Sequence, residues 1–436
     1  MGAHPAQAVV NALQRRVASI KMFGSAVISQ ALLSAANFVA GVLLIRHTTD
    51  QQYGYYILAA TAILLLTSLQ GAFFNPPLVN RLALLDRPGR GDLVGGLYRD
   101  QRRVLLLFGA LALISSTVLW QLAWVSQQEF SLLVITSLAL LAVLQRNYFR
   151  LTLLAYRRSH DVLRTDVGFV LILLLGIPLA LLTPQPAVSA ILATGLAAAV
   201  SGVWTSRALR QHEPWNTRGM PGILREVAPL AIWSTAGAGI HWAFSQGYMY
   251  LAAGTLDIAA VAAIAATRLL MMPVNLLSAG IGTLMLSMTT GWLHQHGLVV
   301  AFRRLTLFAL ALGGVSLCYF VTVWWLRDWI FAEVLQKQFA QRDALLLLWS
   351  AAFFCMVIRD QLLYLLVARE RFRQLTSLAC ISASASLLAG YLGMQQWGVI
   401  GAPAGVLMGE VLNLVGILIL ALRQGVMNPR TAMAPG

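Results

Sequence analysis

Charged residues are scarce in this sequence, and their scarcity excludes a soluble globular chain. Only 11% of the 436 residues are charged, whereas a soluble domain usually has about a quarter. Hydrophobic residues make up 58%, and apolar runs long enough to cross a bilayer recur from near residue 22 to residue 422. Inside a bilayer only helices satisfy their own backbone hydrogen bonds within one segment. The sequence therefore predicts an all-α polytopic membrane protein.

The sequence also lacks the motifs of several common chemistries. Its three cysteines, Cys318, Cys355 and Cys380, lie in apolar runs and have no metal-ligand spacing. There is no glycine-rich phosphate loop and no pair of histidines at metal spacing, so we expect no direct use of ATP, no metal and no other cofactor. No loop is long enough for a catalytic domain, and we expect no enzyme. No cleavable signal peptide is evident, and residues 6–21 are typical of a short amphipathic helix.

Basic residues outnumber acidic ones, 31 against 16, and their distribution indicates topology. They are concentrated in short loops on one side of the apolar runs, as in Arg81 to Arg103 and Arg207 to Arg225. The loops on the other side carry only Arg46, Arg327, Lys337 and Arg342. The positive-inside rule then places both termini in the cytoplasm, which needs an even number of spans. This explains the basic charge without a nucleic-acid partner. The stretch 81–103, which contains DRPGRGD, is expected to be a flexible cytoplasmic connector.

Twelve apolar runs can be separated along the chain. We expect spans at 22–45, 55–80, 104–125, 131–155, 163–183, 186–206, 226–252, 258–289, 305–326, 344–367, 374–394 and 398–422. Bends are expected at Pro178, Pro229, Pro273 and Pro403. The run GAPAGVLMGE (401–410) is a stripe of small residues that predicts close helix packing.

A weak internal repeat divides the chain into two halves. QRRVLLLF (101–108) corresponds to FRRLTLFA (302–309), and LLAYRRSHDVL (153–163) corresponds to LLVARERFRQL (365–375). Each half holds an even number of spans, so the two halves have the same orientation. We expect a cytoplasmic N-terminal segment 1–21, a six-helix lobe 22–210, a cytoplasmic linker 211–225, a second six-helix lobe 226–423 and a cytoplasmic tail 424–436.

Two stretches resemble a known group of transporters. GSAVISQALLSAANFVAGVLLIRHTTDQQYGYYILA (24–59), with Tyr53-Gly54 after a short outer turn, resembles the opening of polysaccharide and O-antigen flippases. These belong to the multidrug/oligosaccharidyl-lipid/polysaccharide exporter superfamily. ATRLLMMPV (266–274) resembles an Arg-Leu and Pro arrangement that is frequent in their eighth span. The second half departs from the pattern, since Ala260-Val261 stands where a Tyr-Gly pair is expected.

The resemblance implies a fold and a function. It implies two six-helix lobes in a V around a central cavity that works by alternating access. The substrate would be a lipid-linked oligosaccharide or polysaccharide precursor in the bacterial inner membrane. Membrane lipids, and other polysaccharide-assembly proteins, would be its partners.

Charged side chains inside the apolar spans are the main candidates for substrate binding. Each costs roughly 2.5–3.5 kcal/mol at a helix centre, so each is expected to face a cavity or a partner. The basic members are Arg146, Arg150, Arg268 and Arg359, and the acidic members are Asp360 and Glu410. Because cations outnumber acids, we expect an unpaired cationic lining that suits a diphosphate or an acidic sugar.

The basic members allow more than one interpretation. Arg146 and Arg150 share one helix face near the cytoplasmic end, where they either bind substrate or snorkel to the surface. Arg268 lies roughly 15 Å into its span, with no acidic residue within a helical turn, which favours a cavity or ligand role.

The neighbouring acidic residues are candidates for ion pairs or for coupling to an ion. Arg359 and Asp360 are adjacent and point in different directions on a helix, so each is expected to pair with another helix. Glu410 either bonds a neighbouring helix or takes part in coupling.

The seventh span holds a group of polar and aromatic residues in STAGAGIHWAFSQGYMY (234–250). His241, Ser245 and Tyr248 fall on one face, and Trp242, Gln246 and Tyr250 on an adjacent face. We take His241, Trp242, Gln246 and Tyr248 as candidates for a sugar-binding wall. A hydrogen-bonded packing seam between helices explains the same pattern.

Three further functions compete with a flippase. A multidrug or cation exporter of the same superfamily would need acids in its cavity, whereas this sequence favours arginine. A membrane glycosyltransferase, polymerase or ligase would need a large outer loop or an acidic catalytic motif, and neither is present. A non-transporting subunit of a polysaccharide secretion complex is the third alternative.

Overall fold

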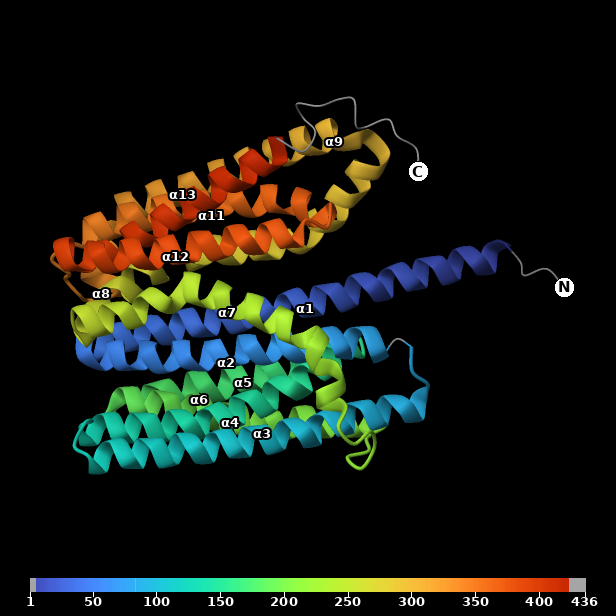
Figure 1. The fold of residues 1–436 in the computed structure, drawn as a ribbon, viewed down its shortest axis with the longest axis horizontal. Helices are drawn as coiled ribbons and strands as arrows, with labels where there is room; N and C mark the ends of the chain where they lie inside the picture. The colour runs from blue at the N-terminus through green and yellow to red at the C-terminus, as the bar shows by residue number, and fades with distance from the viewer. Residues whose placement is uncertain (1–4, 83, 423–436) are drawn as a thin grey trace. The chain divides into compact units, whose positions relative to one another are not determined.

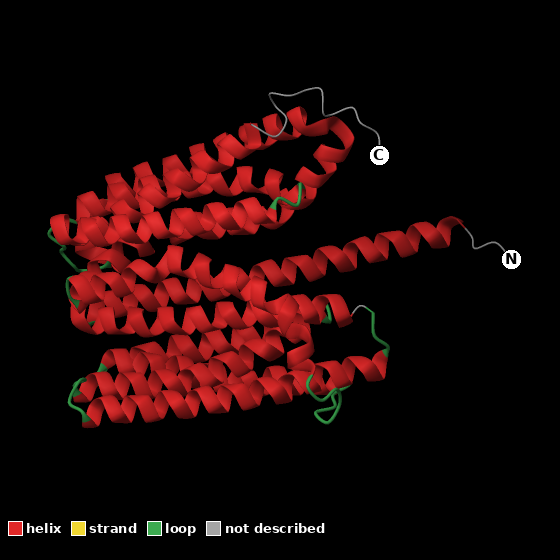
Figure 2. Ribbon diagram, in the orientation of Figure 1, coloured by secondary structure: helices red, strands yellow, loops and turns green. Residues whose placement is uncertain are grey.

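The architecture is helical throughout. A computed structural model describes residues 5–82 and 84–422, so the predicted tail 424–436 lies outside the described residues (Figure 1). No strand occurs in these ranges, and helices follow one another through short loops (Figure 2). The predicted all-α class is confirmed.

Thirteen α-helices are present in the described ranges. The first seven are α1 (Pro5–His47), α2 (Asp50–Leu82), α3 (Arg87–Gln121), α4 (Gln127–Ala155), α5 (Ser159–Leu181), α6 (Pro186–His212) and α7 (Ile223–Thr255). The others are α8 (Ile258–Leu269), α9 (Met272–Trp325), α10 (Arg327–Trp329), α11 (Arg342–Ala368), α12 (Phe372–Trp397) and α13 (Gly401–Ala421). A π-helical turn, Ile330–Val334, follows α10, and a 3₁₀ turn, Gly398–Ile400, precedes α13.

The predicted spans can be found on these helices. Within the described residues, nine helical segments are long and apolar enough to cross a membrane, or ten if α8 and the start of α9 form one bent span. One of the nine, Phe372–Ala421, contains both α12 and α13. The 33-residue α7 contains the predicted span 226–252. About twelve spans therefore agree with the helices observed.

One break lies within the predicted eighth span, and a second lies between the eighth and ninth spans. Helix α8 and the first part of α9, Met272–Gly282, meet at a 52° bend, and Pro273 stands in the first turn after the break. The Tyr319 hydroxyl donates to the Leu270 carbonyl at 2.7 Å, which satisfies a backbone group that the break frees. The bend predicted at Pro273 is confirmed. Farther along, α9 is interrupted at Gly297, whose φ of 78° is readily adopted only by glycine.

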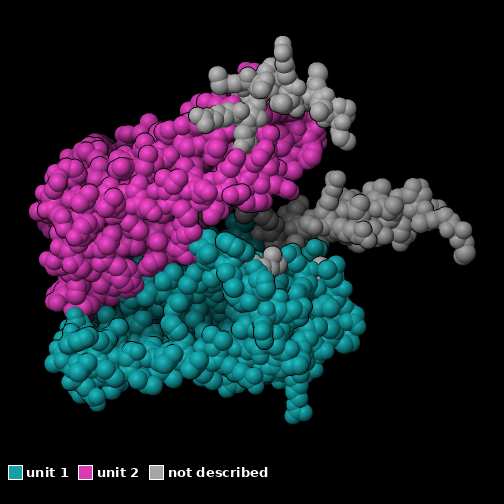
Figure 3. Space-filling view, in the orientation of Figure 1, with its two compact units in different colours: residues 1–40, 59–238 teal, residues 41–58, 239–436 magenta. Residues whose placement is uncertain are grey.

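The chain forms two compact units, coloured separately in Figure 3. Unit 1 contains residues 1–40 and 59–238, and unit 2 contains residues 41–58 and 239–436. Three helices, α1, α2 and α7, contribute residues to both units. In unit 1, α4 packs along α6 and α3, and α5 packs along α6; in unit 2, α11 packs along α9 and α13, and α12 along α13.

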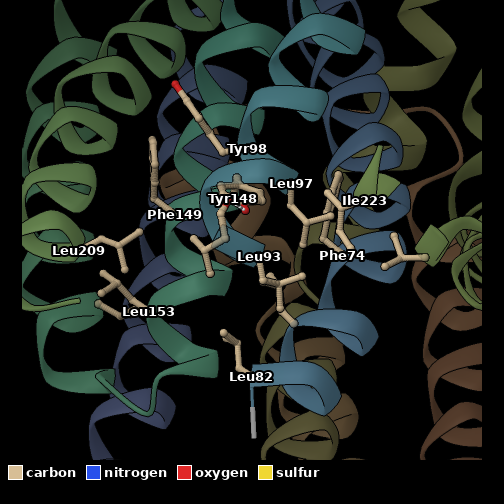
Figure 4. Close-up of a cluster of buried hydrophobic side chains, with 14 residues drawn as sticks. Phe74, Leu82, Leu93, Leu97, Tyr98, Tyr148, Phe149, Leu153, Leu209 and Ile223 are labelled. Carbon is tan, nitrogen blue, oxygen red and sulfur yellow. Dashed lines mark hydrogen bonds between the residues drawn. The ribbon is translucent and has the colours of Figure 1, made fainter. Parts of the chain in front are cut away.

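A large apolar core lies at the end of unit 1 that holds the α2–α3 connection. Its fourteen buried side chains come from α2 to α7 and include Leu93, Leu97 and Tyr148, none of which is measurably exposed (Figure 4). Leu93 and Leu97 lie in the stretch 81–103, which we expected to be a flexible connector. That expectation is wrong, because α3 begins at Arg87 and Asp86 caps it by accepting a hydrogen bond from the Gly89 amide.

Glycines explain why this stretch is ordered although its composition is typical of a loop. A Cβ on Gly95 would collide with the Asn216 backbone, so the linker after α6 can approach α3 only where glycine stands. Asn216 donates its backbone N–H to the Gly91 carbonyl at 3.1 Å. Arg99 donates to the carbonyls of Thr217 and Met220 at 3.1 and 3.3 Å. These glycines therefore form a surface on α3 against which the linker packs, and they do not act as a hinge.

The predicted small-residue stripe packs as expected. Gly401 lies against the backbone of Gly393, and Gly405 lies against that of Gly390, so a Cβ at either position on α13 would collide with α12. This close, antiparallel contact explains why small residues recur every fourth position between 401 and 409.

Candidate functional site

The intramembrane charges gather into three clusters, each within one unit. In unit 1, Asp166 on α5 is the centre of the first cluster and is only 1% exposed. Its carboxylate oxygens accept from Arg146 at 2.5 Å and from Arg150 at 3.0 Å. The Ser29 hydroxyl of α1 also donates to Asp166. Residues from α1, α4 and α5 thus meet around one carboxylate.

The first cluster explains how two guanidinium groups can lie inside a helical bundle. Arg146 and Arg150 are one turn apart on α4, so both face α5. Arg146 also lies over the Phe169 ring at 4.0 Å. Arg146 is buried, and snorkelling to the surface is therefore wrong for it. Two arginines and one aspartate leave one net positive charge at this junction.

The second cluster lies in unit 2 between α9, α11 and α13. Arg359 contacts Asp360 of its own helix at 2.7 Å and Glu410 of α13 at 2.7 Å. Ser278 of α9 donates to the second oxygen of Asp360 at 3.3 Å. The sequence predicted pairing with another helix, which is confirmed for Arg359 through Glu410. The direct contact between the adjacent Arg359 and Asp360 was not expected. One arginine and two acids leave one net negative charge here.

The third cluster surrounds Arg268 on α8. Its guanidinium donates to the Gln246 amide oxygen of α7 at 3.0 Å. The rings of Tyr248 and Trp349 each lie 6.0 Å from it, at the outer limit of a cation–π contact. Within the described residues no carboxylate lies at ion-pair distance from Arg268. It is therefore the one member of the predicted basic set that polar and aromatic groups hold without a counter-ion.

A small cavity joins the second and third clusters inside unit 2. It measures about 40 Å³ and is lined by Arg268, Glu410, Ser245 and aromatic side chains including Trp349. That space holds a water molecule but not a sugar ring. The Tyr248 hydroxyl and the Trp349 indole N–H, both buried, have no hydrogen-bond partner in the described part of the chain. The protein therefore leaves some of the polar groups around this cavity without a hydrogen bond.

The structure corrects the predicted charge balance. Asp166 is missing from the sequence-based set, although it lies within the predicted span 163–183. Arg146, Arg150 and Arg359 each have a carboxylate partner, so an unpaired cationic lining is wrong for these three. Arg268 alone of the four has no carboxylate partner among the described residues, as predicted. Substrate binding by any of the four stays a prediction.

The residues of the seventh span that were predicted to form a sugar-binding wall do not all lie together but contact different neighbours. Gln246 and Tyr248 are buried and join the Arg268 cluster. Trp242 instead packs against Tyr250, with ring centroids 5.7 Å apart. His241 is exposed and near enough to Arg359 and Asp360 to interact with their charges. The sequence missed Trp349, which comes from α11, because nothing in the sequence places its ring next to that of Tyr248.

Comparison with solved structures shows the fold. The lipid II flippase MurJ, in an inward closed conformation, superposes with a TM-score of 0.75 at 11% identity over 90% of this chain and 86% of that one. The next two structures are described as transporters of the multidrug/oligosaccharidyl-lipid/polysaccharide exporter superfamily. An inward-facing multidrug resistance transporter of the MATE family gives a TM-score of 0.69 at 13% identity, covering 89% of this chain and 93% of that one.

A third similar structure is a transporter of the same superfamily from Pyrococcus furiosus, which is described as having a binding pocket of reverse polarity. Its TM-score is 0.60 at 14% identity, over 93% of this chain and 95% of that one. No family model and no curated protein matches the sequence. The resemblance in residues 24–59 and 266–274 is thus confirmed at the level of the fold.

Proposed function

We propose that this chain is a flippase that moves a lipid-linked oligosaccharide or polysaccharide precursor across the bacterial inner membrane by alternating access. The fold supports membrane transport, and a flippase for lipid II is among the structures that share it. The proposal includes cytoplasmic termini and two six-helix lobes, 22–210 and 226–423. It also includes substrate contact by the arginines of the spans and by His241, Trp242, Gln246 and Tyr248.

The proposal depends mainly on the environment of Arg268, which has no carboxylate partner among the described residues. A guanidinium inside a span costs several kcal/mol unless a partner compensates it, and no described carboxylate does so here. A diphosphate or an acidic sugar would supply the missing charge and accept two parallel hydrogen bonds. The buried rings of Tyr248 and Trp349 lie beside the guanidinium and help to hold it in place for such an anion.

A multidrug or cation exporter is the second candidate, and the second cluster favours it. Asp360 and Glu410 outnumber Arg359 there, and their net negative charge would attract a cation. The same two acids are the candidates for coupling transport to an ion. The two functions therefore differ in which cluster meets the substrate.

Deleting the gene in its own host tests the proposal. We expect an exported glycan to disappear and its lipid-linked precursor to accumulate on the cytoplasmic face. The measurement is surface glycan together with precursor that remains inaccessible to a periplasmic enzyme or lectin. Normal surface glycan with increased sensitivity to cationic drugs would reject the flippase and support the exporter.

A further inference from the structure

A basic cavity opens in unit 1 beside the interlobe linker. It measures about 610 Å³ and lies between α3 and the start of α7, with Arg99, Arg103 and Arg225 among its lining residues. Arg99 pairs with Asp100 at 3.0 Å and donates to linker carbonyls, so these two charges cancel. Arg103 and Arg225 are exposed and have no ion pair in the described part of the chain. Two free guanidinium groups thus face this cavity.

The start of α7 adds to the attraction for an anion. Gly222, with φ of 77°, ends the linker, and both Gly222 and Leu224 line the same cavity. The first N–H groups of a helix have no partner within the helix, and its dipole is positive at that end. The guanidinium groups and the helix end therefore point to a ligand with a compact negative charge, such as a phosphate.

A second, apolar cavity lies next to the basic one, along α2 and α3. It measures about 280 Å³ and shares Phe73, Val104 and Leu224 with the basic cavity. Beyond these it is lined mainly by carbon, as far as Leu66 and Phe108. From the three shared lining residues we infer that the two cavities are continuous, and we call them the unit 1 groove, with a basic mouth and an apolar extension.

One polar atom in the apolar part has no partner of its own. Gln101 lines this cavity and is only 4% exposed, yet its Oε1 accepts no hydrogen bond from the described residues. Gln70 lines the same cavity, and in contrast its amide nitrogen donates to the Leu144 carbonyl and its amide oxygen accepts from Asn147. A buried amide oxygen without a donor is unusual, and a water molecule in this cavity would supply the donor, which a lipid chain cannot do.

We propose that the unit 1 groove binds a phosphate-bearing lipid, whose phosphate meets Arg103 and Arg225 and whose chain enters the apolar extension. A free phosphate would use the mouth but leave the extension empty. Arg103 directly precedes the predicted span 104–125, which puts the mouth at the depth of lipid headgroups. The inference goes beyond the proposed function, because it rests on unit 1 alone and holds whatever the chain transports.

Photocrosslinking in nanodiscs of phosphatidylcholine tests the groove. The full chain is given a photoactivatable prenyl phosphate or a photoactivatable phosphatidylglycerol at equal mole fraction, with inorganic phosphate as competitor. We expect crosslinks on peptides that contain Leu66 to Phe108. Each arginine removed should weaken binding roughly tenfold, so Arg103→Gln with Arg225→Gln should weaken it roughly a hundredfold. Arg102→Gln, an exposed neighbour outside the groove, is the matched control and should bind normally.

The two lipid probes distinguish two kinds of ligand. Preferential capture of the prenyl phosphate identifies a carrier lipid, and equal capture of both probes identifies a bulk anionic lipid. Both results support the proposal that the groove binds a phosphate-bearing lipid. Ala228→Trp, which fills the mouth without altering charge, should also reduce capture, so the test does not depend on how well the double variant folds. Unchanged capture in both variants, or no crosslink in the wild type, overturns the proposal. Capture by a chain whose deletion leaves surface glycan normal would reject the flippase but not the groove.

Discussion

Asp166→Ala is expected to lower the free energy of unfolding by about 3–5 kcal/mol, because it leaves two buried guanidinium groups without their shared carboxylate. Arg146 and Arg150 both depend on Asp166, and Ser29 loses an acceptor as well. Membrane abundance should fall with stability. The measurement is the unfolding temperature of detergent-purified protein, together with its amount in the membrane fraction.

Asp161 on the same helix provides the matched control. It pairs with Arg158 at 2.5 Å, three residues away, at a more exposed place. The pair is partly buried, but Arg158 also lies 3.8 Å from Glu213 and keeps that partner, so Asp161→Ala should change the unfolding temperature much less than Asp166→Ala. Equal unfolding temperatures for the two variants would show that the Asp166 junction does not hold the three helices together.

Arg268→Ala is expected to reduce transport at least tenfold while membrane abundance stays close to normal. Losing a charge-assisted hydrogen bond to the substrate costs roughly 1.5–3 kcal/mol, which corresponds to a tenfold effect or more. Abundance should hold because no described carboxylate is left without a partner. Arg268→Lys should recover part of the activity, since the charge is kept and the bidentate geometry is lost. Surface glycan and protein amount are measured in the same cells.

Arg359→Ala is the comparison that gives the Arg268 result its meaning. It leaves Asp360 and Glu410 uncompensated, so its abundance should fall together with activity. If Arg268→Ala also falls in abundance, Arg268 is a structural residue. If Arg268→Ala has normal abundance and normal glycan, Arg268 is outside the substrate site.

The sequence predicts helices and their contacts well where the pattern that indicates them lies within a single helix. Apolar runs predict the spans, Pro273 predicts the bend between α8 and α9, and the small residues at 401–410 predict close packing. Each of these depends on residues adjacent in the chain or on one face of one helix. Physical rules for span length, proline and small residues then suffice.

Contacts between distant segments account for the errors. Asp166 and its arginines are 16 and 20 residues apart, and Ser29 is 137 residues away from it, so no local pattern reveals their junction. The glycines of 81–103 are typical of a mobile loop until the linker near Asn216 is seen packed on them. Side-chain charge can be counted in a sequence, but its neutralisation depends on which helices are neighbours.

The two charged clusters of unit 2 explain why the fold alone does not identify the substrate. A flippase and a multidrug transporter share the fold, and this chain has both an arginine without a counter-ion and a cluster with one acid in excess of arginine. The choice depends on whether Arg268 or the acids meet the substrate.

Translocation by the purified chain in liposomes tests the central claim most directly. A lipid-diphosphate-linked oligosaccharide is placed in one leaflet, and its arrival in the other is followed with a lectin that cannot cross the membrane. We predict transfer by the wild-type chain, at least tenfold slower transfer by Arg268→Ala, and no transfer in protein-free liposomes. Equal transfer with and without the protein, in a preparation that exports a cationic drug, would contradict the account.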